Sequence, residues 1–238
     1  MKFPTVDELK NFIIEKGCFE RDENMRILHS IFIPCYKTFN QLSRYFNFNK
    51  KKVLDLGCGY GEFLINFDES SSGIDVQDRL LKFAGSLGLS VTRLNVEENL
   101  DLAEKFDVVF AGQLLDHLVA PHKLLVESRQ VLKDEGYLIA CVDNIDFLLS
   151  RRVSEQHLYG FNLKSLKVLL QRSGFDIVKL FTLTSNKPKI VETVINASPV
   201  LLSRSMLLYA IAAKDLTYKY PERRFSWFSP SWLPKELE

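Results

Sequence analysis

The stretch Val53-Leu54-Asp55-Leu56-Gly57-Cys58-Gly59-Tyr60-Gly61-Glu62-Phe63 decides the fold. It reads as a short apolar strand that enters three closely spaced glycines, and it predicts an amphipathic helix directly after them. Glycine has no Cβ, so the backbone here can turn tightly and approach a ligand. An isolated turn of this kind is as often a packing corner as a ligand site, so the rest of the chain has to decide between the two.

Short aliphatic or β-branched runs recur along the chain at intervals long enough for a crossover helix. This alternation predicts an α/β fold with a doubly wound, mostly parallel sheet of seven strands, the last of which is a candidate for an antiparallel strand. Helices are expected at Pro121–Leu132, stopped by Asp134-Glu135-Gly136, and at Leu163–Arg172, capped by Asn162 and ended by Gly174. The expected strands are Val53–Leu56, Gly73–Val76, Val91–Leu94, Val108–Ala111, Tyr137–Val142, Ile177–Leu183 and Met206–Ala213.

Three regions follow from these patterns. Residues 1–50 are expected to form an N-terminal helical cap, with Pro34 kinking or splitting its second helical stretch. This cap either covers a ligand site, with Tyr36 among its polar groups, or only packs on the sheet. Residues 51–215 are expected to form the ligand-binding domain. Residues 216–238 form an aromatic tail that is expected to wrap the protein's own surface, with a dimer contact or a lipid-facing patch as alternatives.

The composition of the chain indicates which binding partners and which cell compartment to expect. A formal net charge of +1 provides no general field for a nucleic-acid backbone, so nucleic acid is not expected as a partner. The four cysteines form no cluster at zinc-ligand spacing, so no metal is expected, and reduced thiols fit a cytoplasmic protein. The N-terminus lacks the layout of a secretory signal, and no apolar run is long enough for a membrane span. A homodimer is left open.

The residues around the glycines exclude two classes of ligand and favour a third. Counting from Gly57 and Gly59 places Glu62 where a dinucleotide fingerprint needs its third glycine, which disfavours a nicotinamide-dependent reductase. No Lys-Ser or Lys-Thr closes a phosphate-binding P-loop. Asp75 ends the next strand, where a carboxylate can accept both hydroxyl protons of a ribose; the alternative is that it caps the helix that begins near Asp78.

The ordered motifs resemble those of class I S-adenosylmethionine-dependent methyltransferases, in particular the branch of ubiquinone-type and sugar-modifying enzymes. The resemblance covers about residues 51–181. It implies a Rossmann-like fold, S-adenosylmethionine as cofactor and a small-molecule methyl acceptor. Its motifs are the Asp55–Gly61 turn, Asp75, Phe106-Asp107-Val108-Val109, Leu115-Asp116-His117-Leu118, Leu132–Leu138, His157-Leu158-Tyr159-Gly160-Phe161 and Ser173-Gly174-Phe175.

The same resemblance implies roles for individual residues. Asp55 would orient the methionine end of the cofactor, which Gly57, Gly59 and Gly61 would line together with the ribose. Asp75 would hold the ribose hydroxyls. Further cofactor contacts are expected from Val76, Asn95, Val96 and Glu97 at the adenine, and from Ala111, Gly112, Gln113 and Leu114 on the near side of the site. Asn95 stands where the family often has Asp, but its amide can still exchange hydrogen bonds with adenine.

Histidines are the candidate general bases for an acceptor that must lose a proton, because imidazoles ordinarily titrate near neutral pH. His117 follows the fourth strand, and His157 lies in a segment that could fold over the pocket; both also fit structural roles. The chain is therefore expected to methylate an oxygen or nitrogen of a small molecule. The alternative is a catalytically silent cofactor-binding subunit. Methylation of a nucleic-acid base nitrogen is disfavoured, since Gly112-Gln113-Leu114-Leu115 stands where Asn-Pro-Pro-Tyr or Asp-Pro-Pro-Tyr would be.

Overall fold

The computed structural model describes residues 3–146, 157–183 and 207–219. Within these ranges the strands are β1 Val53–Leu56, β2 Ser72–Asp75, β3 Val91–Arg93, β4 Phe106–Gly112, β5 Leu132–Asp143, β6 Phe175–Leu183 and β7 Leu207–Lys214. They form one seven-stranded sheet in the order β3-β2-β1-β4-β5-β7-β6. The strands β1 to β5 pair in parallel, and β7 runs antiparallel to β5 and β6. The predicted doubly wound, mostly parallel sheet is confirmed.

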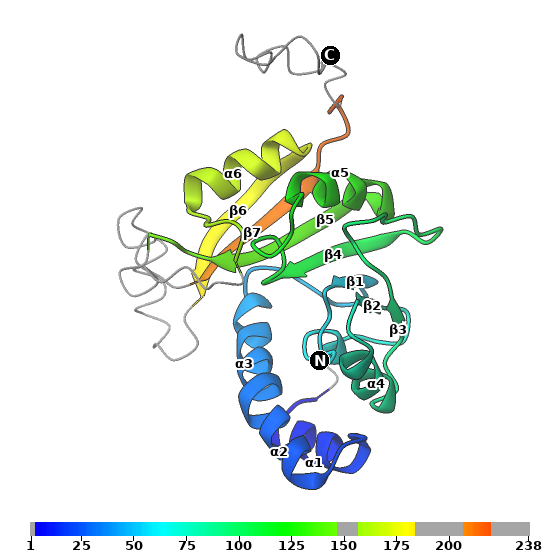
Figure 1. Ribbon diagram of the computed structural model, residues 1–238. Coiled ribbons are helices and arrows are strands. Elements are labelled where there is room, and N and C mark those ends of the chain that lie inside the picture. Colours follow the sequence, from blue (N-terminus) through cyan, green and yellow to red (C-terminus); the bar gives the residue numbers. More distant parts are fainter. Residues whose placement is uncertain (1–2, 147–156, 184–206, 220–238) are drawn as a thin grey trace, which may run out of the picture.

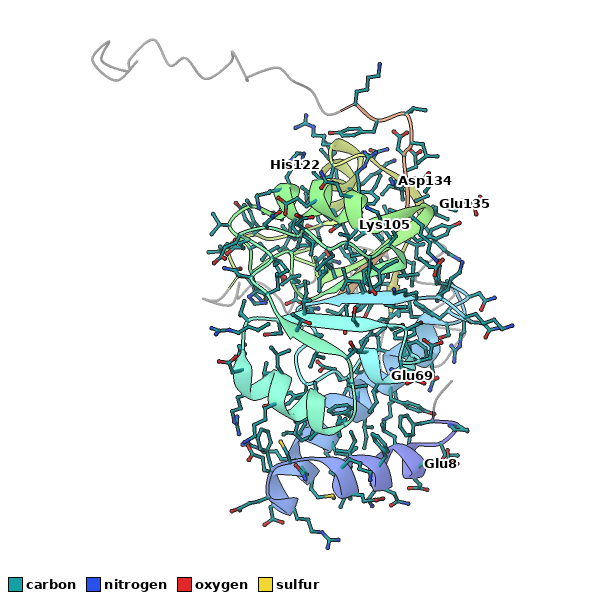
Figure 2. The ribbon with its side chains drawn as sticks, turned by 90° about the vertical axis from the view of Figure 1, so that its right-hand side faces the viewer. Glu8, Glu69, Lys105, His122, Asp134 and Glu135 are labelled. Carbon is teal, nitrogen blue, oxygen red and sulfur yellow. The ribbon has the colours of Figure 1, made fainter. Side chains whose placement is uncertain are left out.

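Helices cover both faces of the sheet (Figure 1). Their bounds are α1 Val6–Lys16, α2 Arg21–Ile27, α3 Ile33–Leu42, α4 Asp78–Ser86, α5 Pro121–Val131 and α6 Leu163–Arg172. Helices α5 and α6 lie on one face, and α3 and α4 lie on the other. Seen from the side, α1 and α2 form a further layer beyond α4, away from the sheet (Figure 2). None of the helices in the described ranges combines the length and the apolarity that a bilayer span requires.

The face under α5 and α6 holds an aliphatic core. Leu124 and Leu125 of α5 and Leu166 and Leu170 of α6 are at most 1% exposed and pack with inward residues of the sheet. Full burial of one leucine side chain stabilises a fold by about 1.5–3 kcal/mol, so the 3- and 4-residue spacing read from the sequence is what attaches these helices.

The opposite face is aromatic. Phe63 stacks on Phe110 of β4 with ring centroids 3.6 Å apart, and Phe39 of α3 meets Phe63 edge-on. Farther out, α1 and α2 bury an apolar cluster that includes Phe83 of α4 and Ile65. The N-terminal helices therefore pack on the sheet's own covering elements.

Several local expectations were wrong. No α-helix follows Gly61; a 3₁₀ turn at Leu64–Asn66 stands there instead. The carboxamide of Asn66 donates to the carbonyls of Glu62 and Phe63, so it competes with a regular helix for those groups. Residues Asp134 to Gly136 lie inside β5, because the chain becomes extended at Leu132.

Three further expectations concern Pro34, the aromatic tail and the domain boundaries. A π-helical turn at Leu28–Phe32 joins α2 to α3, and Pro34 lies in the first turn of α3. The backbone is helical at both ends of that turn, so Pro34 does not split the second helical stretch into separate helices. The aromatic tail lies beyond residue 219, outside the described residues apart from its first few positions. The three domain boundaries stay predictions.

Helix α6 begins at the residue that the sequence indicated. Asn162 Oδ1 accepts a hydrogen bond from the Ser165 amide at 2.9 Å, and Ser165 Oγ accepts one from the Asn162 amide at 2.9 Å. This reciprocal capping box satisfies two amides that the helix itself cannot. Gly174, with φ of +81°, follows the helix at its C-terminal end.

We expect Asn162→Ala to lower the free energy of unfolding by about 1 kcal/mol, because the Ser165 amide loses its acceptor. Urea denaturation followed by circular dichroism measures this loss. Lys164→Ala, on the exposed face of the same helix, is the control and should change stability by less than about 0.5 kcal/mol. Equal effects of the two substitutions would contradict the capping role.

Candidate functional site

The glycine turn after β1 is fixed by β2. The amides of Gly57 and Cys58 both donate to the Ile74 carbonyl, at 2.8 and 3.0 Å. Gly57, Gly59 and Gly61 have φ of +68°, +56° and +80°, a region that side chains with a Cβ rarely adopt. The turn lies where the sheet order reverses between β1 and β4, which is where open α/β sheets bind their ligands.

Asp75 at the end of β2 faces this turn. Its Oδ2 accepts from the Gly59 amide at 3.0 Å, and its Oδ1 accepts from the Gln77 amide at 2.9 Å. Each carboxylate oxygen can accept a second hydrogen bond, so both remain available to ligand hydroxyls. The predicted juxtaposition of the glycines with Asp75 is present.

The residues expected at the adenine divide into two groups. Val76 is 49% exposed beside Asp75, which suits an apolar contact with a base. Val96, by contrast, is 6% exposed and packs in the core. The side chain of Asn95 spans its own turn, since Oδ1 accepts from the Glu97 amide and Nδ2 donates to Glu98. Glu97 Oε1 accepts from the Val119 amide.

The residues after β4 lie on the other side of the glycine turn. Ala111 is fully buried, and Leu114 is close enough to the turn that a Cβ on Gly57 would lie 3.1 Å from its Cδ1. Gln113 has φ of +52°, and its Nε2 donates to Asp143 Oδ1 at 3.2 Å. Gly112 has room for no Cβ, since one would lie 2.5 Å from the Phe110 ring. Of these residues, Leu114 therefore packs beside the glycine turn, and the cofactor contacts expected of the four stay predictions.

Two buried carboxyl groups lie beneath the turn. Asp55 is 2% exposed, and its Oδ2 and the Oε2 of Glu62 are buried without a hydrogen-bond partner. Burial, followed by the charges of Glu62 and Asp75, holds the pKa of Asp55 well above its usual range. Burial also raises the pKa of Glu62 to about 7, against the lowering effect of hydrogen bonds from the Tyr60 and Glu62 amides. From the sequence, Glu62 was predicted only to replace a glycine of the dinucleotide fingerprint, and its buried carboxyl group was not predicted.

A second cluster forms across the switch point. Asp116 is 1% exposed, with Oδ1 4.0 Å from Nε2 of His117 and Oδ2 3.7 Å from Nε2 of His157. The two imidazole rings meet edge-on with centroids 4.6 Å apart. On the other side of His157, Nδ1 lies 3.9 Å from Asp143 Oδ2 at the end of β5. The structure therefore brings both candidate bases together.

Backbone contacts hold this cluster. The amides of Leu158 and Tyr159 donate to the Asp116 carbonyl, and the Tyr159 hydroxyl donates to the Val119 carbonyl at 2.8 Å. Burial raises the pKa of Asp116, although the two neighbouring imidazoles lower it. No role was predicted for Asp116 and Asp143 from the sequence, although an acid at the end of a parallel strand is a usable signal for Asp143.

Two further features bear on the site. Ligand atoms of Asp116, His117 and His157 lie within 4.8 Å of one another, so these residues could share a metal ion, which the cysteine pattern did not suggest. Tyr36, expected among the polar groups of an acceptor site, is instead 6% exposed, and its hydroxyl contacts the carbonyls of Phe3 and Pro4. Its role in this structure is to hold the N-terminus against α3.

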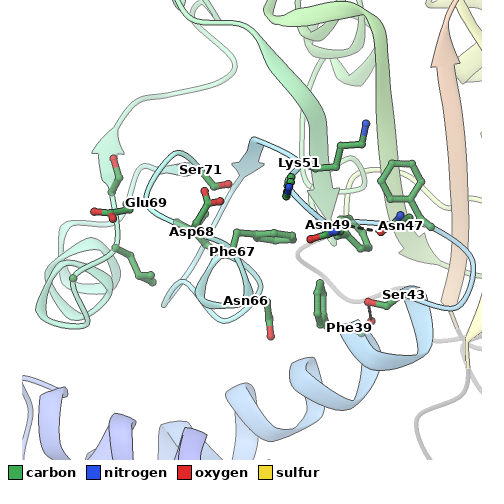
Figure 3. A pocket seen from close by; sticks show the side chains of 17 residues that line it. Phe39, Ser43, Asn47, Asn49, Lys51, Asn66, Phe67, Asp68, Glu69 and Ser71 are labelled. Carbon is green, nitrogen blue, oxygen red and sulfur yellow. Dashed lines mark hydrogen bonds between the residues drawn. The ribbon is translucent and has the colours of Figure 1, made fainter. Parts of the chain in front are cut away.

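A cavity of about 780 Å³ lies away from these groups (Figure 3). It is lined by residues that precede β1, β2 and β3, among them Lys51, Ser71 and Ser90, together with Phe39 of α3. It therefore opens at the amino ends of the strands, whereas the glycine turn and both carboxyl clusters lie at the carboxyl ends. The cavity volume favours the amino ends of the strands, whereas the side-chain chemistry favours the carboxyl ends. The left-handed glycines, Asp75 and the buried acids all lie at the carboxyl ends, so we place the candidate site there.

Residues 29–180 match the model of a family described as a methyltransferase domain. A ubiquinone biosynthesis O-methyltransferase of Glaesserella parasuis is 30% identical over 108 residues, which are 40% of this chain and 46% of that protein. An uncharacterised protein of Methanocaldococcus jannaschii is 29% identical over 68% of this chain and 69% of its own length.

The structure of a S-adenosylmethionine-dependent methyltransferase from Archaeoglobus fulgidus matches with a TM-score of 0.58 and 25% identity, over 76% of this chain and 94% of that one. By contrast, the chain spans less than half the length of the Glaesserella parasuis enzyme.

The buried Glu62 carboxyl makes stability depend on pH. Its pKa of about 7 in the folded protein exceeds the ordinary value of 4.5, so its contribution is complete below about pH 4.5 and is lost as the pH rises through about 7. We expect Glu62→Gln to become progressively more stable than the parent protein across this window, by of the order of 2 kcal/mol at pH 8. Thermal unfolding of both proteins between pH 5 and 8 measures the difference. A difference that does not change with pH would contradict the assigned burial.

Proposed function

Because this chain belongs to the class I S-adenosylmethionine-dependent methyltransferase family, we propose that it transfers the cofactor's methyl group to an oxygen or nitrogen of a small-molecule acceptor. The observation that supports the proposal is the hydrogen bond between the Gly59 amide and Asp75 at the switch point of the sheet. Asp116 and the two histidines lie on the other side of that switch point. The proposed cofactor site and the candidate proton acceptors thus lie at the same edge of the sheet.

The residues around the turn fit the cofactor. A Cβ on Gly59 would lie 3.1 Å from Glu62 Oε2, and one on Gly73 would lie 2.7 Å from Cys58, so the turn depends on small residues at both positions. Asp75 would accept hydrogen bonds from the ribose hydroxyls, and exposed Val76 would contact the adenine. When bound, the cofactor supplies a methyl group already activated by its sulfonium.

The protein's own task is then to position the acceptor. Alignment of two reactants can supply about 7–11 kcal/mol of the barrier in favourable cases. An acceptor hydroxyl must also lose its proton, and His117 or His157 would take it. The buried Asp116 carboxylate between their Nε2 atoms would orient both rings and stabilise the imidazolium that forms.

Free thiols agree with the expected cytoplasmic location. Cys18, Cys35, Cys58 and Cys141 form no disulfide in the described ranges, and reduced cysteines are usual in reducing compartments. Homodimer formation and the absence of a nucleic-acid partner stay predictions.

We expect Asp75→Ala to weaken S-adenosylmethionine binding at least about tenfold, because hydrogen bonds between hydroxyls and a carboxylate contribute about 1.5–3 kcal/mol. Isothermal titration calorimetry measures this affinity. Asp101→Ala removes an exposed acid outside the site and is the control. Unchanged affinity in Asp75→Ala would sink the ribose assignment.

We expect His157→Gln or His117→Gln to lower kcat about 10²-fold while KM for the cofactor stays unchanged, since the lost group acts on the acceptor's proton. The acceptor is first identified by incubating the protein with metabolite extract and methyl-labelled S-adenosylmethionine. His122→Gln is the control, because His122 lies on α5 and contacts the Arg172 carbonyl.

Three outcomes separate the alternatives. Cofactor binding without any labelled product would identify a catalytically silent subunit. Loss of activity after dialysis against EDTA, restored by a divalent cation, would assign the Asp116 cluster to metal binding. Full activity in both histidine variants would exclude them as bases.

A further inference from the structure

The imidazole ring of His157 lies between two carboxyl groups, one at each ring nitrogen. Its Nε2 is 3.7 Å from Oδ2 of the buried Asp116, and its Nδ1 is 3.9 Å from Oδ2 of Asp143. The side chain of His157 is 15% exposed, whereas that of His117 is 36% exposed. Of the two candidate bases, His157 is therefore the more enclosed, with an acid at each ring nitrogen.

The two ring nitrogens of His157 face different parts of the sheet. The strands follow one another in the order β1, β4, β5, and Asp116 follows β4 whereas Asp143 ends β5. Leu114, which packs beside the glycine turn, precedes Asp116 in the same connection. Nε2 thus lies on the side of the glycine turn, and Nδ1 lies on the side away from it. A base that serves methyl transfer at that turn therefore has to accept the proton on Nε2.

Asp143 is itself held in place by Gln113. Nε2 of Gln113 donates to Asp143 Oδ1 at 3.2 Å, and the Gln113 backbone amide donates to the Cys141 carbonyl at 2.8 Å. Gln113 has a φ of +52°, in the left-handed region that residues with a Cβ rarely adopt. Such conformations persist where surrounding contacts require them, and they gather at functional sites. Because Oδ1 is bound to Gln113, Oδ2 is the oxygen that Asp143 presents to His157.

Backbone hydrogen bonds fix the chain around His157 to the strand ends that carry the two acids. The Ile145 amide donates to the Phe161 carbonyl at 2.9 Å, and the Leu158 amide donates to the Asp116 carbonyl at 2.7 Å. The alignment of acid, imidazole and acid is therefore set by the backbone. Its distances of 3.7 and 3.9 Å exceed a hydrogen bond, and contacts between catalytic groups are often this long until substrate binds.

We propose that Asp143 is a positioning residue that accepts the Nδ1 proton of His157 and so keeps Nε2 unprotonated, and that Gln113 holds Asp143 for this task. The inference rests on the proposed function, and it selects His157 over His117 as the base. With a hydroxyl acceptor, the O–H bond breaks, the proton passes to Nε2, and the electron pair stays on the oxygen that receives the methyl group.

Asp116 has a different part in this arrangement. It faces Nε2, the nitrogen that takes the proton, so a hydrogen bond from Nε2 to Asp116 would block the base. The tautomer of a neutral imidazole is set by the partner of the nitrogen that does not react, which is Asp143 at Nδ1. Asp116 would instead stabilise the imidazolium once the proton has arrived.

The substitution Asp143→Asn tests the proposal with little change of shape. Its carboxamide oxygen would stay with the Gln113 donor, so its amino group would turn toward Nδ1 of His157. A donor at Nδ1 moves the imidazole proton to Nε2, which can then accept nothing. Asp146→Asn is the matched control, because Asp146 is an exposed acid farther along the same segment and the same charge is removed.

Nitrogen-15 NMR of the histidine rings measures the tautomer directly, since protonated and unprotonated ring nitrogens have separate shifts. The protein is first dialysed against EDTA and studied at a pH where the His157 ring is neutral. The signals of His157 are assigned by their absence in His157→Gln. We expect the proton on Nδ1 in the parent protein and in Asp146→Asn, and on Nε2 in Asp143→Asn.

Methyl transfer measures the consequence for catalysis. We expect Asp143→Asn to lower kcat at least about 10²-fold while KM for S-adenosylmethionine changes less than about twofold, because the loss concerns the acceptor's proton. Asp146→Asn should keep the parent's kcat. The unchanged KM also shows that the Asp143→Asn variant is folded.

Two results would overturn the proposal. One is a His157 ring that carries its proton on Nε2 in the parent protein, a measurement that needs no variant and no acceptor. The other is an Asp143→Asn variant that keeps the parent's kcat. An absence of methyl transfer by the parent protein would refute the proposed function, and with it the role of His157 as a base, whatever the tautomer.

Discussion

The left-handed backbone of the turn after β1 is the constraint on which the site depends. Two successive amides, of Gly57 and Cys58, share one carbonyl of β2, and this forces the chain to double back over the sheet edge. The close approach of Cys58 to Gly73 is tolerated only because Gly73 has no Cβ. From this turn follow the position of the Gly59 amide on Asp75 and the burial of Asp55 beneath it.

The two acidic clusters differ in their surroundings. At the turn, burial raises the pKa values of Asp55 and Glu62, and neither carboxyl group forms an ion pair among the described residues. The cluster around Asp116 instead places its carboxylate beside two imidazoles, which can hold and release a proton. Both clusters lie at the carboxyl edge of the sheet, on either side of the β1–β4 switch point where open α/β sheets bind their ligands.

The features that were predicted correctly from the sequence are those determined by residues close together in the chain. The alternation of apolar runs identified the strands, and the Asn162 cap and Gly174 located α6, because those signals act within a few residues. The helix expected after Gly61 failed, since Asn66 offers its backbone neighbours a competing donor. The convergence of Asp116, Asp143 and His157 could not be predicted from spacing, because Asp116 follows β4, Asp143 ends β5 and His157 follows β5, and only the folded sheet brings them together. Glu62 was visible in the sequence, but its burial was not.

The most direct measurement of the central claim is a crystal structure of this protein grown with S-adenosylhomocysteine. We expect the ribose hydroxyls on Asp75, the adenine against Val76 and the homocysteine part over Gly57 to Gly61. Binding at another place, such as the cavity beside Phe39 at the opposite edge of the sheet, or a turn at Gly57 to Gly61 that remains closed to the ligand, would contradict it.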